Sequence, residues 1–354
     1  MKKTRLKTRQ HGFTLIEIMI ALVLGAFLIG GVLQIFLSSK QTYRMQDNLS
    51  RIQENGRFAM EFISRDVRGA DYWGCLGGGS LSGNITNNLD PAGAGYDSVI
   101  DGFGQGIEGT NGAAGANLAL DAPDSITLRG AYGGIAVMPP FGPQASANIN
   151  VTAGNNLTQG EIVIVSDCSK GDIFQISNAN PSTSGTVVHN TGNATSPGNK
   201  NANPATGCPS SGNKHCLSKI YRSDAQILKT QTVIYSIQNG ASGQPALFKK
   251  VNGAAAVEMI EGIENMQILY GVYGVDTNDN KTPDYYVPAD QVVDMSKVVS
   301  VRISLLAVSL EDNLTSQPVA YIYNDNGTPT TPTDRKLRRV FTSTIVLRNR
   351  LRGK

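Results

Sequence analysis

The apolar positions of this chain form two patterns: one long unbroken run near the N-terminus and many short runs in the last two thirds. The long run follows Phe13, and from Ile18 to Leu37 its only conventional polar side chain is Gln34. About 20 apolar residues, each rising roughly 1.5 Å along a helix, are enough to cross a bilayer. Residues 13–37 are therefore predicted to form a membrane-spanning helix.

The same helix is predicted to continue beyond the membrane. No proline occurs before Pro91, and apolar residues between positions 38 and 68 recur at near-helical spacing. Oppositely charged neighbours such as Glu61 and Arg65 suit an exposed helical face. An uninterrupted helix from Phe13 to about Arg68 would be on the order of 80 Å long. Such a length suits a filament spine that carries a head on its outer half.

The pattern changes after residue 75, where Gly, Asn, Ser and Ala become frequent and long helical periodicity ends. Residues 76–120 and 177–216 are rich in turn and loop formers. Strand-like runs occupy 125–129, 161–166, 172–176, 229–238, 246–251, 263–275, 298–310 and 339–347. In one of them Val299, Val301 and Ile303 alternate with polar residues, which is typical of a half-buried strand. We therefore predict an α+β fold, in which a long N-terminal helical spine is followed by a mostly antiparallel β-sheet head.

A basic leader precedes the apolar run. It contains Lys2, Lys3, Arg5, Lys7 and Arg9 and no acidic residue. By the positive-inside rule this leader stays in the cytoplasm, so the head is placed on the opposite side of the membrane. An ordinary secretory signal has a shorter apolar core followed by its cleavage site. Here the expected cleavage point, between Gly12 and Phe13, comes before the apolar segment and leaves the membrane helix in place.

The sequence Gly12-Phe13-Thr14-Leu15-Ile16-Glu17 resembles, together with its flanks, the class III leader of type IV prepilins and type II secretion pseudopilins. The resemblance implies that a prepilin peptidase cleaves after Gly12 and N-methylates Phe13. A lone carboxylate in a membrane segment is costly, so Glu17 is expected to be functional. By resemblance it pairs with the N-terminal amine of a neighbouring subunit's Phe13 and sets the register of assembly. The alternative is an uncleaved signal anchor, in which a buried glutamate has no purpose.

The motif Tyr72-Trp73-Gly74-Cys75 and the late strands that end in residues 340–347 look like the PilW group of minor pilins, which is related to J-type pseudopilins. This likeness covers scattered patches of the head, and the same aromatics also fit a core where helix meets sheet. It implies a minor pilin that helps to initiate or prime a type IV pilus and is incorporated near the tip. Such pili serve adhesion, twitching motility and, in some bacteria, DNA uptake.

The resemblance also implies a domain division, a location and partners. Residues 1–12 are the cleaved leader, 13–70 the N-terminal helix, and 71–354 a β-rich periplasmic head. The protein is expected in the inner membrane as a single-pass subunit before assembly and in the extracellular pilus afterwards. The expected partners are other minor pilins, the major pilin, the prepilin peptidase and the inner-membrane assembly machinery.

Charge and motif content argue against two other classes. The formal net charge of the whole chain is +3, but removal of the leader leaves 26 basic against 28 acidic residues, a net charge of −2. No specific nucleic-acid binding is therefore expected. His189 and His215 are the only histidines after the leader, both in Gly/Asn-rich stretches, and neither GxSxG nor HExxH occurs. We therefore do not expect an enzyme.

The four cysteines are Cys75, Cys168, Cys208 and Cys216. An even count in an exported chain indicates two disulfides, and four cysteines allow three pairings. A bond between Cys208 and Cys216 would close a small loop and leave Cys75 to pair with Cys168. A metal site or free thiols are the alternative, but no CxxC occurs and His215 beside Cys216 is a single coincidence.

Residues 276–284 form the sharpest local motif of the head. Its oxygen-bearing candidates are Asp276, Asn278, Asn280 and Asp284, at the first, third, fifth and ninth positions of a calcium-type loop. Lys281 replaces the usual turn glycine and Val287 the usual glutamate, so an Asx-rich hairpin tip is the alternative. Apart from this candidate Ca²⁺ site, no cofactor is expected.

Two further patterns have simple structural explanations. Residues 104–109 fit GxGxxG, but a flexible-looking sequence follows instead of a helix, so a loop is predicted rather than a phosphate site. Arg348, Arg350 and Arg352 would face one side of a strand. They are predicted to protect a solvated edge strand, with an acidic subunit or DNA phosphates as the alternative contact.

Three alternatives to the pilus function follow from these observations. A minor pseudopilin of type II secretion would have the same leader and a related head. A pilus-tip adhesin would bind a surface ligand without other subunits. A membrane-anchored enzyme would keep its leader and need a reactive group of side chains, which the sequence does not show.

Overall fold

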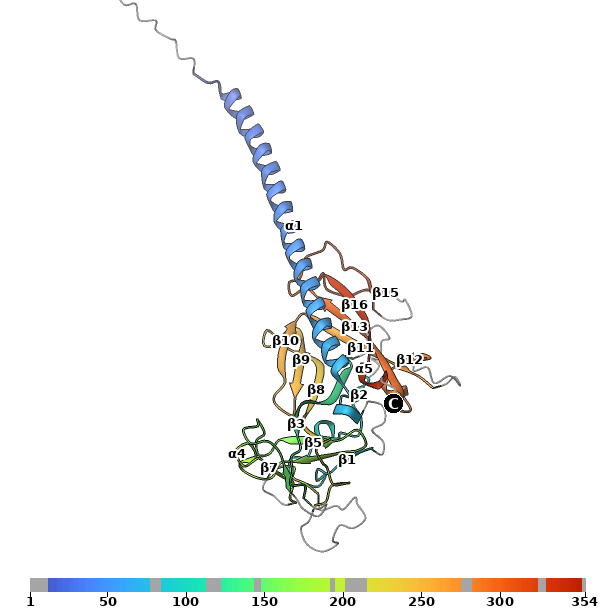
Figure 1. Ribbon diagram of the computed structural model, residues 1–354. Helices are drawn as coiled ribbons and strands as arrows, with labels where there is room; N and C mark the ends of the chain where they lie inside the picture. The colour runs from blue at the N-terminus through green and yellow to red at the C-terminus, as the bar shows by residue number, and fades with distance from the viewer. Residues whose placement is uncertain are drawn as a thin grey trace, which may run out of the picture.

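The computed structural model describes residues 12–76, 84–112, 122–142, 148–191, 195–200, 215–274, 282–323 and 329–351. One long helix, α1 (Leu15–Gly69), projects from a head made mostly of strands (Figure 1). The first part of α1 stands free, and its second part packs against the head (Figure 1). The predicted α+β fold, a helical spine followed by a mostly antiparallel β head, is confirmed.

Only the second half of α1 has buried residues. These are Asn48, Ile52, Gly56, Ala59, Ile63, Ser64 and Val67, which recur every three or four residues and so share one face of the helix. A Cβ atom at Gly56 would overlap the ring of Phe341, so glycine lets the helix approach the sheet closely there. The helix ends before Asp71, whose φ of 61° turns the chain away from the helix axis.

A four-stranded antiparallel sheet lies beside α1, in the order β12–β11–β13–β16. Its strands are β11 (Ile263–Val272), β12 (Tyr285–Val287), β13 (Val298–Val308) and β16 (Arg338–Val346). In the central register Ile303 of β13 lies opposite Ile268 and Ser343. The alternating residues Val301, Ile303 and Leu305 are buried together with Ile63 of α1 in the main core.

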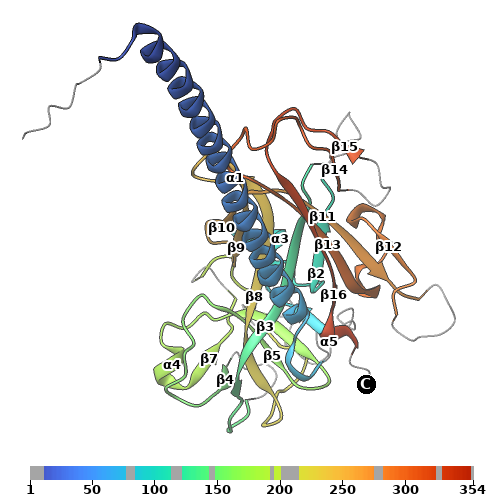
Figure 2. The same cartoon turned by 90° about the horizontal axis from the view of Figure 1, so that it is seen from above.

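A second sheet continues the head away from this one. Its main path runs β1–β6–β5–β8–β3–β2, and β9 and β10 extend it next to β8. The bounds are β1 (Ile85–Asn87), β2 (Ile107–Thr110), β3 (Ser125–Ala136), β5 (Ile162–Ser166), β6 (Gly171–Gln175), β8 (Gln226–Asn239), β9 (Pro245–Val251) and β10 (Val257–Glu261). Figure 2 shows α1 lying between the β9–β10 hairpin and the four-stranded sheet.

We call residues 84–90 and the described part of 137–225 the distal lobe, because they lie beyond the C-terminal end of α1 (Figure 1). The lobe contains β1, β5 and β6, the small sheet of β4 (Asn148–Asn150) with β7 (Thr186–Val188), and α4 (Pro181–Ser184). Within the described residues, β1 and β6 are the one parallel pair of strands. The lobe has its own apolar core, which includes Phe174 and Leu157.

The connections in the rest of the described chain are short elements. They are η1 (Gly74–Leu76), α3 (Ser98–Asp101), η2 (Ala289–Gln291), η3 (Met295–Lys297), β14 (Tyr321–Ile322), β15 (Pro329–Thr330) and α5 (Arg348–Leu351). The α3 segment and η1 lie next to the distal lobe in the sequence. The α5 helix follows β16 and brings the C-terminal end of the described chain back to the end of α1.

Candidate functional site

The expected cleavage point lies just outside the long helix. Gly12 and Phe13 precede the N-cap residue Thr14, and the side chain of Phe13 is 84 % exposed. A peptide bond in an exposed, non-helical segment is easier for a peptidase to bind than one inside a helix, where the backbone groups are already hydrogen-bonded. The geometry at Gly12 and Phe13 is therefore compatible with processing, which stays a prediction.

Glu17 closes a capping box with Thr14. The backbone N–H and the hydroxyl of Thr14 both donate to Glu17 Oε2 at 2.9 Å, and Glu17 N–H donates to Thr14 Oγ1 at 3.3 Å. Two of the backbone donors at the start of the helix are satisfied in this way. The Thr-x-x-Glu spacing is a sequence signal for this arrangement. The carboxylate thus has partners within its own chain, and pairing with a neighbouring amine requires Glu17 to exchange them.

The first half of α1 has no partner in the described part of the chain. Its apolar side chains from Leu15 to Leu37 are exposed, and the helix is long and apolar enough to cross a membrane. A buried core helix would pass the same test of length and composition, but this stretch is not buried. A continuous exposed apolar surface of this size needs either lipid or other helices as its surroundings.

A buried ion pair attaches the C-terminal end of α1 to the far end of the chain. Asp71 accepts hydrogen bonds from Trp73 Nε1 at 2.8 Å and from Arg350 Nε at 2.6 Å. Arg350 also donates to the carbonyls of Val298, at 2.7 Å, and Met295. Asp71 is fully buried and Arg350 is 3 % exposed. The charges are therefore paired and hydrogen-bonded, as buried charges must be.

This pair corrects the sequence prediction for the C-terminal arginines. The strand β16 ends at Val346, and Arg348–Leu351 forms the helix α5, so the arginines do not line one side of a strand. Arg350 is buried rather than part of a solvated edge, whereas Arg348 is exposed. Arg352 lies outside the described residues.

A second polar contact holds α1 on the large sheet. Asp66 Oδ2 accepts the hydroxyl of Tyr235 at 2.7 Å and pairs with Lys249 Nζ at 2.6 Å. Burial raises the pKa of the Tyr235 hydroxyl, and the neighbouring Asp66 carboxylate raises it further, so this hydroxyl remains a hydrogen-bond donor. Asn55 adds a hydrogen bond to the carbonyl of Glu261 at 3.0 Å. The outer half of the spine is thus fixed to the head at several points.

The cysteine prediction is confirmed for one pair. Cys75 in η1 forms a disulfide with Cys168 in the turn between β5 and β6, with 4.8 Å between their Cα atoms. The bond ties the end of the spine to the distal lobe across 93 residues of sequence. Cys216 is also disulfide-bonded, and Cys208 lies outside the described residues.

Most of the calcium motif falls outside the described residues. Asp276, Asn278 and Asn280 belong to this part, and only Asp284 is described. The motif connects β11 to β12, which pair as antiparallel strands, and Asp284 N–H donates to the carbonyl of Val272 at 2.8 Å. The hairpin position is therefore established, and Ca²⁺ binding stays a prediction.

The GxGxxG segment is partly a strand rather than a loop. Residues 107–110 form β2, which pairs with β3, and no helix follows within the described residues. A Cβ atom at Gly106 would overlap the carboxylate of Asp71, and one at Gly109 would overlap the ring of Tyr270. These glycines therefore have a packing role.

The two histidines, which the sequence left as unrelated loop residues, form a buried pair. Nδ1 of His189 lies 2.9 Å from Nδ1 of His215, and both side chains are buried. Burial, reinforced by the partner ring, lowers the pKa of His189 to about 3. Burial and the positive charge of Lys200 lower the pKa of His215 to about 4. Both rings are thus neutral near neutral pH.

An exposed apolar helix that follows the predicted processing motif and carries a β head at its other end is the architecture expected of a pilin-type subunit. In comparisons with protein families, the one described as prokaryotic N-terminal methylation motif matches residues 7–33, and the one described as type IV pilus-assembly protein W, PilW, matches residues 234–349. No curated protein and no solved structure matches the chain.

The two matches confirm the resemblance and support a minor pilin of a type IV pilus from the PilW family. They also support membrane anchoring through α1, association with other pilins and the assembly machinery, and a structural rather than enzymatic role. The PilW match begins within β8 and ends within α5. It therefore covers the four-stranded sheet and leaves out the spine and the distal lobe.

Proposed function

We propose that this protein is a minor pilin that joins the growing type IV pilus close to its tip and helps to start assembly. In this proposal the prepilin peptidase removes residues 1–12 and methylates Phe13. The head lies in the periplasm until the inner-membrane machinery lifts the subunit into the filament. Its neighbours there are other minor pilins and the major pilin.

The observation that carries the position near the tip is the distal lobe. The free end of α1 enters the membrane, so the lobe beyond the opposite end of α1 lies on the side away from the membrane (Figure 1). The part of the head that extends past the end of the spine occupies space that a subunit on the tip side of this one would need. A place with few subunits above it accommodates the lobe without a clash.

Glu17 supports a role as an incorporated subunit. Its capping box satisfies the carboxylate in the unassembled chain. During packing of helix against helix, the new N-terminal amine of a neighbour offers a charged partner in place of two neutral ones, and hydrogen bonds between charged groups are stronger. A carboxylate buried without a partner costs free energy. The exchange therefore favours the register that brings the amine of the neighbour to Glu17.

The PilW match favours a pilus over the type II secretion alternative, because the matching family is described as a pilus-assembly protein. The two systems differ in a measurable way. A pilus subunit is recovered with sheared surface filaments, whereas a pseudopilin is recovered with the secretion apparatus in the membrane.

The test is to purify sheared filaments and membranes and to determine the N-terminus of this protein in each by mass spectrometry. We expect N-methyl-Phe13 in the filament fraction and gold-labelled antibody against the head at filament ends. Glu17→Ala should be cleaved normally but be missing from filaments. Glu61→Ala, which changes an exposed glutamate on the same helix, serves as the matched control and should be incorporated.

Three results would contradict the proposal. An intact Met1 in the membrane fraction alone would show an uncleaved anchor. Labelling along the whole filament would refute the position near the tip. Normal incorporation of Glu17→Ala would refute the role of its carboxylate in assembly.

A further inference from the structure

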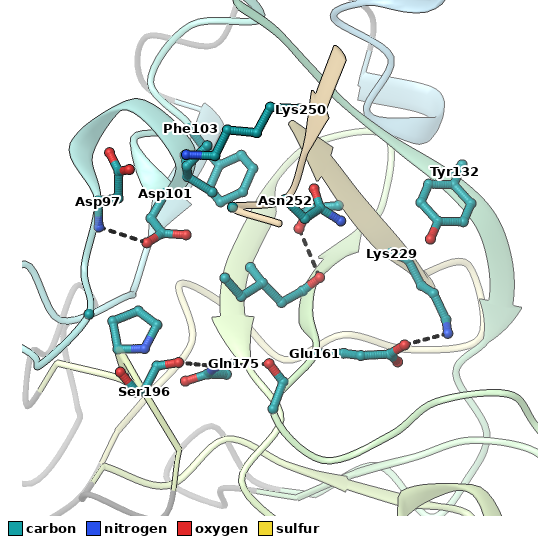
Figure 3. Close-up of a pocket in the computed structure, with 17 residues that line it drawn as sticks. Asp97, Asp101, Phe103, Tyr132, Glu161, Gln175, Ser196, Lys229, Lys250 and Asn252 are labelled. Carbon is teal, nitrogen blue, oxygen red and sulfur yellow. Dashed lines mark hydrogen bonds and ion pairs between the residues drawn. The ribbon is translucent and has the colours of Figure 1, made fainter. Parts of the chain in front are cut away.

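A cavity of about 480 Å³ opens where the distal lobe meets α3 and the ends of β8 and β9 (Figure 3). Its size lies within the range of small-molecule sites in proteins. Seven separate segments of the chain line it: residues 95–103, Tyr132, 160–162, Gln175, 196–197, 229–230 in β8, and 250–253 at the end of β9. Most of this wall precedes residue 234, where the PilW match begins. The cavity is thus largely a feature of the part of the head outside the match.

The walls of the cavity are held in place by buried hydrogen bonds. Arg129 is 1 % exposed and donates to the carbonyls of Gln105 at 3.0 Å and Val99 at 2.7 Å. These two hydrogen bonds hold the α3 segment in place. Gln175 donates to the carbonyls of Gly160 and Ser196, both at 2.8 Å. These bonds do not involve a ligand, so the cavity is formed in advance and binding does not have to order it.

Several polar groups that line the cavity take no part in these structural hydrogen bonds. Within the described residues, the amine of Lys250, the hydroxyl of Tyr132 and the amide nitrogen of Asn252 have no hydrogen-bond partner. Asp97 uses one carboxylate oxygen to cap α3, and Asp101 uses one to accept Asp97 N–H at 3.0 Å. Figure 3 shows Lys250, Asp97 and Asp101 on one side of the cavity and Tyr132 on another.

The charged side chains of the cavity are two lysines and three carboxylates, so one negative charge is in excess. Lys229 pairs with Glu161 at 2.7 Å, which leaves Lys250 on the same side of the cavity as the two carboxylates of Asp97 and Asp101. A polyanion such as a phosphate ester would be repelled by these carboxylates. An apolar ligand would bury the amine and the carboxylates without partners, which costs several kcal/mol for charged groups. A neutral ligand that both donates and accepts hydrogen bonds can satisfy the amine and the carboxylates together.

Apolar surface is present beside these polar groups. The ring of Phe103 and the side chain of Ile100 are buried in the wall, and Tyr132 at the rim is 49 % exposed. Aromatic rings provide flat apolar surface, and tyrosine adds a hydroxyl at its edge. A sugar ring matches this combination, because its hydroxyl groups both donate and accept and its C–H faces are apolar.

We propose that this cavity is a binding site for a neutral saccharide unit. Asp97, Asp101, Asn252 and Lys250 bind the hydroxyl groups, and Tyr132 covers one face of the ring. The site is independent of the assembly function, because neither α1 nor Glu17 contributes to it. Its place on the lobe away from the membrane leaves it open to the medium when the subunit is near the pilus tip.

The experiment uses the full-length protein in a detergent without a sugar headgroup, since a maltoside detergent would itself compete. The probes are glucose, galactose, N-acetylglucosamine, cellobiose, lactose and diacetylchitobiose. Binding is measured by saturation-transfer NMR and by the fluorescence of Trp73, the single tryptophan, which packs edge-to-face on Phe103 with 6.2 Å between ring centroids.

We expect saturable binding of at least one probe. Tyr132→Ala should weaken it by up to about tenfold, in line with the worth of an aromatic contact, and Tyr132→Ala combined with Lys250→Met should abolish it. Tyr285→Ala removes a similarly exposed tyrosine on β12, outside the cavity, and should bind like the wild-type protein. Thermal unfolding of each variant checks that the head is intact.

Three outcomes overturn the proposal. The first is that no probe shows saturable binding. The second is that Tyr132→Ala with Lys250→Met binds as well as Tyr285→Ala, which would place binding elsewhere. The third is that glycine or glutamate displaces the saccharides at lower concentration, which would identify the site as one for an amino acid.

Discussion

Replacement of Arg350 by methionine tests how the head is held on its spine. In the native structure the Arg350 guanidinium, 3 % exposed, lies 2.6 Å from the fully buried carboxylate of Asp71 at the end of α1. Arg350→Met keeps most of the side-chain length but removes the positive charge beside the buried Asp71 carboxylate, which keeps its hydrogen bond from the indole of Trp73. Removal of one member of a buried ion pair typically costs about 3–5 kcal/mol, and most of this cost is the uncompensated charge.

The double variant Asp71→Asn with Arg350→Met separates this cause from simple loss of packing. An amide at position 71 still accepts the N–H of Trp73 at its oxygen, and no isolated charge remains. Well-packed neutral replacements of buried ion pairs are often close to neutral in stability. The double variant should therefore recover most of the stability that Arg350→Met loses.

The assay is urea unfolding of the full-length protein in detergent, followed by the fluorescence of Trp73 and by circular dichroism. Arg348→Met, a change at the exposed arginine of the same short helix, is the matched control and should stay within about 0.5 kcal/mol of the wild-type protein. A loss below about 1 kcal/mol for Arg350→Met, or a double variant as unstable as the single one, would refute the reasoning about buried charge.

Three further predictions concern the distal lobe and the β11–β12 hairpin. His189 and His215 have pKa values lowered to about 3 and about 4. Below about pH 6.5 the unfolded chain therefore binds protons at these histidines that the folded protein does not bind. The free energy of unfolding is highest above that pH and falls by about 2 kcal/mol per histidine at pH 5. Acid unfolding curves check this, and a flatter pH profile is expected for His215→Gln. Cys168→Ser should lower the free energy of unfolding by about 2–5 kcal/mol, because it releases a loop of 93 residues; an unchanged urea midpoint would contradict this. Calorimetry at millimolar Ca²⁺ should give heat that Asp276→Ala removes, and no heat from the wild-type protein would eliminate the site.

The sequence by itself determined the features that depend on near neighbours along the chain. The apolar run after Phe13 and the 3.6-residue spacing up to residue 68 indicate one helix, and the observed α1 is Leu15–Gly69. The alternation in 298–310 corresponds to β13, which ends slightly earlier at Val308. Periodicity is readable in these segments because it reflects which face of the same element is buried. The Thr14–Glu17 capping box has a local signature as well, although its geometry became clear only in the structure.

Only the tertiary structure decided the contacts between distant residues. Asp71 and Arg350 are 279 positions apart, and the repeated arginines at the C-terminus resemble a solvated edge in sequence. His189 and His215 lie in two loops whose approach depends on the packing of the distal lobe, so their spacing gives no signal. The cavity combines side chains from seven segments of the chain, none of which forms a motif alone. Burial and pairing of such groups are set by how the elements pack in three dimensions, and this information is spread over the whole sequence.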